Sequence, residues 1–385
     1  MSLRDVAIVG VHATEQGRQL PHRTALDLAQ EAVFGAIADA GLTPGDVDGV
    51  AADWPGPGGV SGEASSWARA LGRPLNWTSD GMLDAAGARG VIKAAAAISA
   101  GLCDVAVVGG GLAGMFGAGK TVGGGGDNLI EFTDTWGAYV VPIFALVAQG
   151  HMHQFGTTSE QIALVSATIR NNGSVNPEAI MAGKGPYTVD DILSSRPLAS
   201  PFHLLDVCLA GEGGGAVVLT SVERARDLPH PVVAVLGGGM EFSGAAYVTP
   251  PTYRNVGRLG VDAARRAFSM AGVSPTDVDV LSLYDPNSFE IIRQMEILGY
   301  CEEGEGGAFV EAGHIALDGE RPVNPDGGCL SYAWNGTQQM TLKVVEAVRQ
   351  LRGNAVNQVE GASVALAANA GSGAGHYELA VLGRV

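Results

Sequence analysis

The sequence has few charged side chains, and positive ones are the scarcest. Of its 385 residues, 16% are charged, and 23 Lys and Arg stand against 40 Asp and Glu, a formal net charge of −17. A nucleic-acid-binding surface needs a basic patch, and so does binding to an anionic membrane, so we expect neither partner. Because soluble domains average about 25% charged residues, the shortage indicates a large buried core or an extensive subunit interface.

Cysteine is also scarce, and long apolar runs are missing. The four cysteines lie far apart without a CxxC pair, which argues against a zinc site and against a disulfide framework: Cys103, Cys208, Cys301 and Cys329. No apolar run reaches the ~18 residues of a membrane span. The opening MSLRDVAIVG resembles a start followed by a strand, so we expect no signal peptide and a cytoplasmic, reducing setting without a bound metal.

Glycine is in excess, with 57 residues against a usual share of ~7%. One glycine-rich stretch, GMFGAGKT at 114–121, matches the P-loop pattern. A P-loop must leave a strand directly and open a helix, because backbone N–H groups and the helix N-terminus cradle the phosphate. Here we expect the preceding strand to end at Val108, and the VGGGG after Thr121 is a poor helix start. We therefore interpret the stretch as a flexible, glycine-rich connection rather than a nucleotide site.

An internal repeat predicts the architecture. AGLTPGDVDGV (40–50) returns as AGVSPTDVDVL (271–281), with six of eleven positions identical. An amphipathic helix pattern precedes each copy, and a strand precedes each helix. After each copy the chain again shows a turn, a helix and a buried strand, at 79–111 and at 325–373. Each half is therefore predicted to run strand–helix–strand–helix–strand.

The strands of both halves are nearly continuous apolar runs, which is typical of a sheet covered by helices on both faces. Two such halves related by a pseudo-twofold axis form a layered α/β fold. We predict a first half at 1–231, which includes an inserted cap at about 112–200, and a second half at 232–385.

Several stretches, taken together, resemble the thiolase superfamily, in the branch of sterol-carrier-protein-type thiolases that includes lipid-transfer-protein-like steroid side-chain aldolases. Residues 151–180 are similar to the family's cap and residues 187–221 to its return into the core. NPDGGCLSYAWNGT (324–337) and NAGSGAG (369–375) are similar to its two C-terminal loops. The resemblance covers almost the whole chain and implies a thiolase-like αβαβα fold and a homodimer.

The residues of thiolase chemistry are nevertheless missing. Thiolases acylate a cysteine at a helix N-terminus, where the helix dipole lowers the thiol pKa, and the matching position here is Asp84. Tyr284 and Trp334 stand where these thiolases have catalytic histidines. Asn369 stands where classical thiolases carry an acid/base cysteine. A carboxylate cannot carry an acyl group by thiol exchange, so the reaction must differ.

Two tyrosines remain, Tyr284 and Tyr332, on loops that we expect at the carboxyl ends of strands, where open α/β sheets bind ligands. The aldolase branch resembles this chain in using a tyrosine at each place. The resemblance therefore implies a carbon–carbon lyase that cleaves a β-hydroxyacyl-CoA of steroid side-chain type into a ketone or aldehyde and a shortened acyl-CoA. We assign Tyr332 as base and Tyr284 as proton donor, and the reverse order of these roles stays open. CoA is part of the substrate, and no cofactor is expected.

Asp84, Asn369 and Trp334 are expected to support the tyrosines. Asp84 orients a donor or caps a helix, and Trp334 shapes the acyl pocket. The glycines of the two C-terminal loops are expected to bind substrate, with backbone N–H groups of the second loop or an ordered water at the enolate oxygen: Gly327, Gly328, Gly371 and Gly373. His151 and His153, two residues apart, are interpreted as surface residues or packing residues of the cap rather than metal ligands.

Two alternatives stay open. A thiolase-like scaffold without catalysis would lose the same cysteine and histidines, and a thiolase with an atypical nucleophile would use Cys329 in GGCLSY. The distinguishing feature is whether the Tyr284 and Tyr332 hydroxyls face one pocket. The resemblance also implies a small partner protein with an OB-fold and a zinc ribbon, which completes the active site in a heterotetramer.

Overall fold

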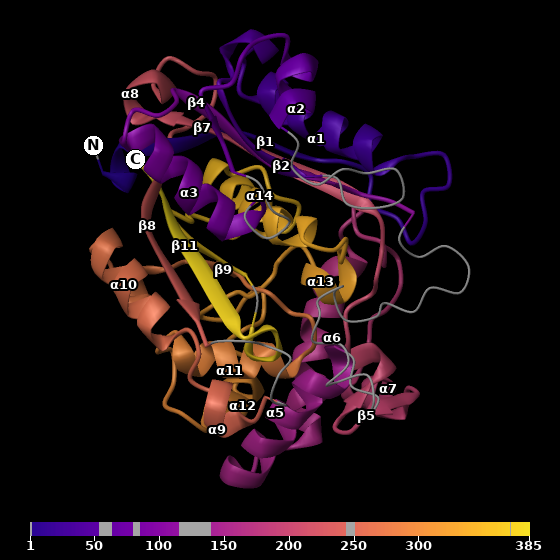
Figure 1. Cartoon of the computed structure of the whole chain (residues 1–385). Coiled ribbons are helices and arrows are strands. Elements are labelled where there is room, and N and C mark those ends of the chain that lie inside the picture. Colours follow the sequence, from indigo (N-terminus) through magenta and orange to yellow (C-terminus); the bar gives the residue numbers. More distant parts are fainter. Residues whose placement is uncertain (1, 54–63, 80–84, 115–139, 244–250, 370) are drawn as a thin grey trace.

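A computed structural model of the chain describes residues 2–53, 64–79, 85–114, 140–243, 251–369 and 371–385 (Figure 1). Within these residues one mixed sheet has the strand order β3-β2-β4-β7-β1-β8-β11-β10-β9. The strands of the first half are β1 (Val6–Ala13), β2 (Gly49–Asp53), β3 (Trp77–Thr78), β4 (Val105–Leu112) and β7 (Gly213–Ser221). Those of the second half are β8 (Val233–Phe242), β9 (Val280–Ser282), β10 (Val364–Asn369) and β11 (His376–Arg384).

Helices connect and cover these strands. Those of the first half are α1 (Ala25–Asp39), α2 (Ala64–Leu71), α3 (Gly87–Ser99) and α8 (Val222–Ala225). The segment between β4 and β7 contains α5 (Val140–Phe155), α6 (Ser159–Ser174), α7 (Val189–Ser194) and the short strands β5 (Pro197–Ala199) and β6 (Phe202–His203). Those of the second half are α9 (Tyr253–Val256), α10 (Val261–Ala271), α11 (Phe289–Ile297), α12 (Gly306–Glu311), α13 (Gly328–Ser331) and α14 (Gln338–Arg352).

The strands of both halves pair in the same way. In the first half β2 runs parallel to β4, and β7 is antiparallel to both β4 and β1. In the second half β9 runs parallel to β10, and β11 is antiparallel to both β10 and β8. Among the described strands, the two halves of the sheet meet where β1 pairs with β8, at Ala7–Ala234 and Ile8–Val233. The predicted α/β fold of two related halves is confirmed.

An aspartate of the repeated DVD sequence makes the same contact in each half. Asp48 Oδ1 accepts hydrogen bonds from the backbone N–H groups of Asp104 and Val105, both at 2.9 Å. Asp279 Oδ2 accepts them from Ser363 at 2.8 Å and Val364 at 2.9 Å. Each carboxylate thereby fixes the start of the neighbouring parallel strand, so the sequence repeat encodes the strand register.

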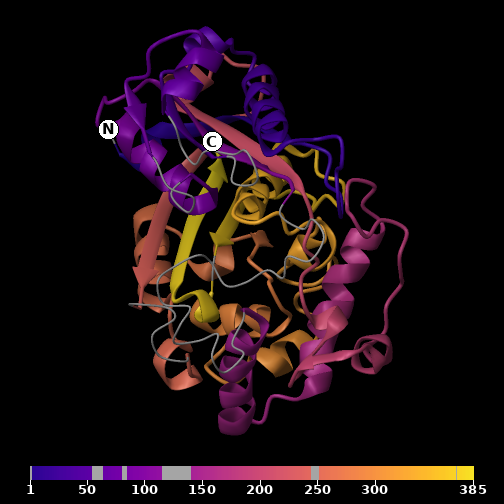
Figure 2. The same ribbon diagram turned by 45° about the vertical axis from the view of Figure 1, so that its right-hand side comes forward.

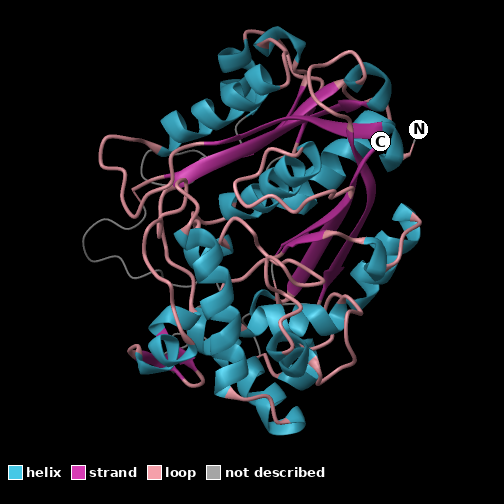
Figure 3. Cartoon of the chain, turned by 180° about the vertical axis from the view of Figure 1, so that it is seen from behind, coloured by secondary structure: helices cyan, strands magenta, loops and turns pink. Residues whose placement is uncertain are grey.

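Two helices occupy the centre of the molecule. Figure 1 shows α3 and α14 between the β1, β2, β4 and β7 part of the sheet and the β8, β9 and β11 part, while α1 and α10 lie outside. Figure 3 shows from behind how the strands bend around the central helices. Separate apolar clusters fill the space under α1, the space around the central helices, and the second half. This layering is the large buried core that the low charge content predicts.

The inserted cap packs on the second half, although it interrupts the first half in sequence. Helix α6 contacts α11, α12 and α13, and α5 contacts α9 (Figure 2). His151 of α5 is fully buried in this contact, between Thr157 Oγ1 at 2.9 Å and Glu296 Oε1 at 3.0 Å. His151 is therefore a packing residue, as its sequence context indicates.

The prediction that the strand after α3 ends at Val108 is wrong. Strand β4 continues to Leu112 because Gly109, Gly110 and Gly111 keep pairing with β7. The P-loop-like stretch thus begins two residues after a strand, and nearly all of it lies outside the described residues. The N–H group of its first residue, Gly114, donates to Glu212 Oε1 at 2.8 Å, and a carboxylate there disfavours phosphate. Among the described helices none is both long and apolar enough to cross a membrane.

Candidate active site

Polar side chains gather where β9 and β10 end. In this parallel pair Ser282 lies opposite Ala367. Two residues further along each strand come Tyr284 and Asn369, so both lie at the same carboxyl edge of the sheet. This is the edge at which α/β proteins bind ligands, as predicted from the sequence.

Tyr284 is 7% exposed, and its phenol contacts Trp334. An indole N–H can only donate, so it donates to the phenol oxygen and leaves the hydroxyl proton for another acceptor. Burial raises the pKa of the Tyr284 hydroxyl well above its ordinary value, and the Trp334 hydrogen bond opposes that rise. Tyr284 is therefore a neutral phenol near neutral pH and suits the role of a proton donor.

A backbone segment, Val207–Gly211, holds the loops of Tyr284 and Trp334 together. Cys208 N–H donates to the Pro286 carbonyl at 2.9 Å, and Gly211 N–H donates to the Trp334 carbonyl at 2.8 Å. Bridges Val207–Asn287 and Ala210–Trp334 reinforce the same alignment. The return of the chain from the cap into the core thus sets the distance between Tyr284 and Trp334.

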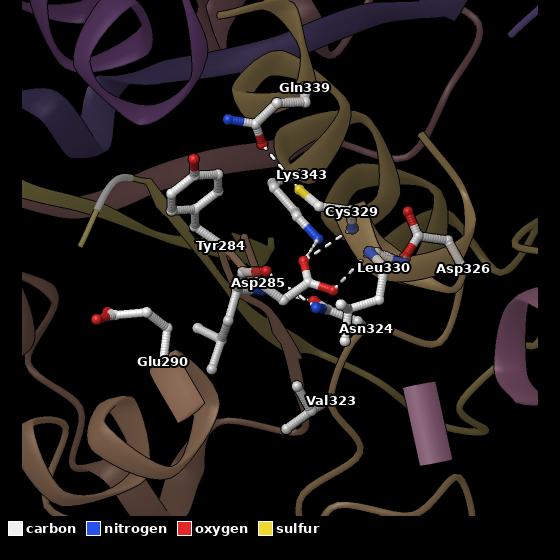
Figure 4. Close-up of polar contacts among 12 residues, drawn as sticks. Tyr284, Asp285, Glu290, Val323, Asn324, Asp326, Cys329, Leu330, Gln339 and Lys343 are labelled. Atoms are coloured by element: carbon white, nitrogen blue, oxygen red, sulfur yellow. Dashed lines mark hydrogen bonds and ion pairs between the residues drawn. The ribbon is translucent and has the colours of Figure 1, made fainter. Parts of the chain in front are cut away.

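A buried ion pair fixes the backbone directly after Tyr284. The Asp285 carboxylate accepts from Lys343 Nζ at 2.8 Å, from Cys329 N–H at 2.8 Å and from Leu330 N–H at 3.2 Å (Figure 4). Asn324 bonds both the N–H and the carbonyl of Leu283, at 2.7 and 3.0 Å. With these partners on both sides, Tyr284 is held in one place.

The glycines of the first C-terminal loop serve close packing. A Cβ on Gly328 would lie 2.2 Å from Asp285 Oδ2, and one on Gly327 would lie 2.4 Å from Gly173 Cα. Their N–H groups donate within the chain: that of Gly327 to Asn324 O at 3.0 Å and that of Gly328 to Asp326 Oδ1 at 2.8 Å. Both predicted substrate-binding donors are therefore already occupied.

The second C-terminal loop is held by Glu290, which the sequence suggests only as part of a helix cap. Asn287 Oδ1 does accept the Glu290 N–H at 3.2 Å, but the carboxylate bonds the Ser372 side chain and, at 3.0 Å, Arg293 Nε. A Cβ on Gly371 would lie 2.4 Å from Glu290 Oε2, and one on Gly373 would lie 2.7 Å from Phe144. These two predicted substrate-binding glycines thus let the loop approach Glu290 and α5.

None of the four cysteines is an activated nucleophile. Burial raises the pKa of Cys103, Cys208 and Cys301 to about 12 each, and raises that of Cys329 well above its ordinary value. Cys329 is 1% exposed, and its thiol donates to Gln339 Oε1 at 3.2 Å. Since the thiolate is the nucleophile, this arrangement disfavours the alternative of a thiolase that uses Cys329, which no comparison tests.

Tyr332 packs in a different apolar cluster from Tyr284. Its ring belongs to a small cluster with Ala179, Ala333 and Leu342, whereas Tyr284 belongs to the main cluster of the second half. Its hydroxyl donates to Glu178 Oε2 at 3.3 Å, and burial raises its pKa. Within the described part of the chain no hydrogen bond joins the two phenols, and the expectation that they face one pocket stays a prediction. The residue that does reach Tyr284 is Trp334, two positions later.

Asp84 lies outside the described residues. Asn369 is fully buried and lies against Gly87, the first residue of α3, where a Cβ would be 2.3 Å from Asn369 Nδ2. Lys343 and Gln339, both on α14, are site residues that the sequence analysis missed. The available sequence signal for Lys343 is weak, because it is one of several polar residues on a helix that a sequence pattern would place in solvent.

A layered α/β fold of two related halves, with its polar site at the carboxyl ends of β9 and β10, is the fold of the thiolases. Human mitochondrial 3-ketoacyl-CoA thiolase superposes on the chain with a TM-score of 0.70, covering 100% of both chains at 16% identity. The Ltp2-ChsH2(DUF35) aldolase superposes with a TM-score of 0.84 at 30% identity, covering 99% of this chain and 98% of its own. The family described as Thiolase C-terminal domain-like matches residues 257–384.

Sequence relatives narrow the class. The steroid side-chain-cleaving aldolase of Thermomonospora curvata is 32% identical, with 91% of each chain covered. The 17-hydroxy-3-oxo-4-pregnene-20-carboxyl-CoA lyase of Mycobacterium tuberculosis is 33% identical, covering 92% of this chain and 93% of its own. An acetyl-CoA acetyltransferase of Methanothermobacter thermautotrophicus is 31% identical, covering 99% and 100%. The chain belongs to the thiolase superfamily, in the branch that contains sterol-carrier-protein-type thiolases and steroid side-chain aldolases.

Proposed function

We propose that this chain is a carbon–carbon lyase, a retro-aldolase that cleaves a β-hydroxyacyl-CoA of steroid side-chain type. Two relatives that match over nine tenths of its length are named as an aldolase and a lyase of such side chains. The relatives named acetyltransferases need an activated cysteine for acyl transfer. The single observation that carries the proposal is that all four cysteines have raised pKa values while a phenol, Tyr284, lies at the thiolase active-site edge.

The reaction balances without a cofactor. A general base removes the proton of the β-hydroxyl group, the bond between Cα and Cβ breaks, and its electron pair forms the thioester enolate. The Cβ carbon leaves as a ketone or aldehyde. Tyr284 then donates its proton to Cα, which gives the shortened acyl-CoA, and the proton taken by the base restores the phenol through solvent. Trp334 supports this role because its indole N–H stabilises the developing phenolate.

The sequence assigns the base to Tyr332, but its contact with Glu178 makes it a hydrogen donor to a carboxylate. The Glu178 carboxylate stabilises the protonated form of the Tyr332 phenol, and this makes Tyr332 a poor base. We therefore propose that Tyr284 carries the proton transfer to carbon and that Tyr332 orders the contact between the turn after α6 and helix α14, through Glu178 and Arg349.

We also propose a homodimer that acts with a second protein. The Ltp2-ChsH2(DUF35) aldolase is named as an assembly of two proteins, and it covers 99% of this chain. The partner expected from the sequence is a small OB-fold and zinc-ribbon protein. Size-exclusion chromatography with light scattering, on the chain alone and with a co-expressed partner, tests both assemblies.

The function is tested by incubating the chain, alone and with that partner, with a β-hydroxyacyl-CoA. We expect a ketone or aldehyde and a shortened acyl-CoA, identified by mass spectrometry. Tyr284→Phe should reduce kcat by about 10²-fold or more, the size of a lost general acid. Tyr332→Phe is the matched control and should change kcat by less than about threefold. Equal losses in both variants would restore the paired-tyrosine mechanism, and no cleavage by the wild-type assembly would favour a non-catalytic scaffold.

A further inference from the structure

Asn369 is a buried side chain without a hydrogen-bonding partner. It is fully buried, and neither Oδ1 nor Nδ2 bonds any group in the described part of the chain. Most buried carboxamides in native proteins are paired, because an unpaired one loses its hydration without compensation. The mechanism above does not use this residue, so the free amide points to a group that the site binds.

The position of Asn369 places this amide at the reacting end of the site. It is the last residue of β10, level with Tyr284 in the parallel register of Ser282 and Ala367. Neighbouring strands lie about 4.8 Å apart, so the two residues leave the sheet side by side. A group that receives a proton from Tyr284 therefore passes within reach of the Asn369 amide.

The surroundings of Asn369 favour negative charge. Gly87 opens α3 with φ +54°, and the absence of a side chain there lets the amide lie against the start of the helix. Ala86, the residue that precedes the helix, supplies no side-chain cap. The first N–H groups of a helix of 13 residues carry partial positive charge, and here the unpaired Nδ2 group lies beside them.

We propose that Asn369 is a catalytic residue that donates a hydrogen bond from Nδ2 to the thioester oxygen. This inference rests on the proposed function. When the bond between Cα and Cβ breaks, negative charge moves onto that oxygen, and a donor fixed in advance by β10 and Gly87 stabilises it without rearrangement. No bond to Asn369 forms or breaks. Asn369 thereby takes the role that the sequence analysis gave to the Gly371–Gly373 backbone.

The test compares two ligands that differ only in the oxygen concerned. Propanoyl-CoA carries the thioester carbonyl, and S-propyl-CoA, a thioether, lacks it. Their Kd values are measured by calorimetry on the full chain, with its partner if the wild type needs one. We expect the wild type to prefer the thioester by about 3- to 10-fold, the size of one hydrogen bond, and Asn369→Ser to lose the preference. In cleavage, Asn369→Ser should lower kcat by about 10²-fold or more and change KM little.

Asn369→Asp is the second variant, because it keeps the shape and replaces the donor with a negative charge. It should lower kcat at least as far as Asn369→Ser does. The matched control is Ser282→Ala, which removes another buried, unpaired oxygen, two residues before Tyr284 on β9. It should leave the ligand preference and kcat within about twofold of the wild type.

The outcomes separate this inference from the function on which it rests. Suppose that the wild type cleaves substrate and that either folded Asn369 variant keeps the wild-type kcat and the wild-type preference for the thioester. Asn369 then serves packing alone, and the inference is overturned. If the wild type neither binds propanoyl-CoA nor cleaves a β-hydroxyacyl-CoA, the proposed function fails, and the inference fails with it.

Discussion

At the carboxyl ends of the parallel strands, the first half of the chain carries Asp53 and Gly110 where the second half carries Tyr284 and Asn369. The equivalence follows from the hydrogen bonds of the Asp48 and Asp279 carboxylates to the backbone, which fix the start of the next strand in each half. We call these two contacts the aspartate clamps. A Cβ on Gly110 would lie 1.8 Å from the Asp53 carbonyl oxygen and 2.7 Å from Gln338 Nε2, so the first half has no room for a side chain there. The repeat thus gives both halves the same backbone arrangement. The side chains at the carboxyl ends of the parallel strands differ, and they limit the candidate site to the second half.

The two central helices also differ, because α14 of the second half buries more polar side chains than α3 of the first half does. The buried residues of α3 are small or aliphatic apart from Arg89. Helix α14 buries Lys343, Glu346 and Gln350, and its Lys343 holds the carboxylate next to Tyr284. A buried charge costs solvation free energy that only its partners offset. Helix α14 buries two ionisable side chains, Lys343 and Glu346, and α3 buries one, Arg89, so α14 depends more strongly on its buried partners.

The largest effect should come from breaking the ion pair of α14. Lys343→Met leaves the fully buried Asp285 carboxylate without its cation, and we expect a loss of about 3–5 kcal/mol in the free energy of unfolding. Lys93→Met on α3, where the lysine is only half-buried, should cost less than about 1 kcal/mol. Urea titrations of both variants measure the difference. Equal losses would mean that the two helices are alike.

A second effect, of comparable size over the whole pH range, should come from pH through Glu346. Burial, reinforced by the nearby Asp326 carboxyl, raises the pKa of Glu346 from 4.5 to about 8. Below pH 4.5 both folded and unfolded chains hold this proton. Between pH 4.5 and 8 the unfolded chain loses it while the folded chain keeps it, so stability falls as pH rises, by up to about 1.4 kcal/mol per pH unit.

Glu346→Gln removes that titration. The variant should therefore gain stability over the wild type at pH 8 and match it near pH 4.5, as measured by urea titration at both pH values. An unchanged pH dependence in the variant would show that Glu346 is ionised in the folded chain.

The smallest effects should come from the two clamps, which test how far the halves are equivalent. Asp48→Ala breaks three hydrogen bonds at a 3% exposed carboxylate, from the Asp104 and Val105 N–H groups and from the Asn76 side chain. We expect a loss of about 2 kcal/mol. Asp279→Ala breaks the matching bonds at a half-buried site and should cost about 1 kcal/mol. Thermal unfolding ranks the two. A large loss at one clamp and none at the other would mean that only one half depends on this register.

The repeat made the topology predictable, because the last aspartate of each DVD sequence bonds the backbone at the start of the neighbouring parallel strand. The site was predictable only down to its loops. Tyr332 and Trp334 lie two positions apart, and the bridge between Ala210 and Trp334, more than a hundred residues away in sequence, decides which of them reaches Tyr284. The domain limit at 231 stays a prediction.

Lys343 shows a second limit of the sequence. A lysine on a helix is read as a solvated residue, and only the placement of α14 between the two parts of the sheet buries it. The length of β4 shows a third, because glycine in a strand is disfavoured by propensity and is retained here by pairing with β7.

The most direct test supplies the wild-type assembly with a β-hydroxyacyl-CoA and, separately, with a 3-ketoacyl-CoA and free CoA, and follows both the products and the intact protein by mass spectrometry. We predict carbonyl product and shortened acyl-CoA from the first substrate, no thiolysis of the second, and no acyl adduct on any cysteine. Thiolysis with an acylated cysteine would contradict the account, because it would return the chain to the chemistry that its raised thiol pKa values oppose.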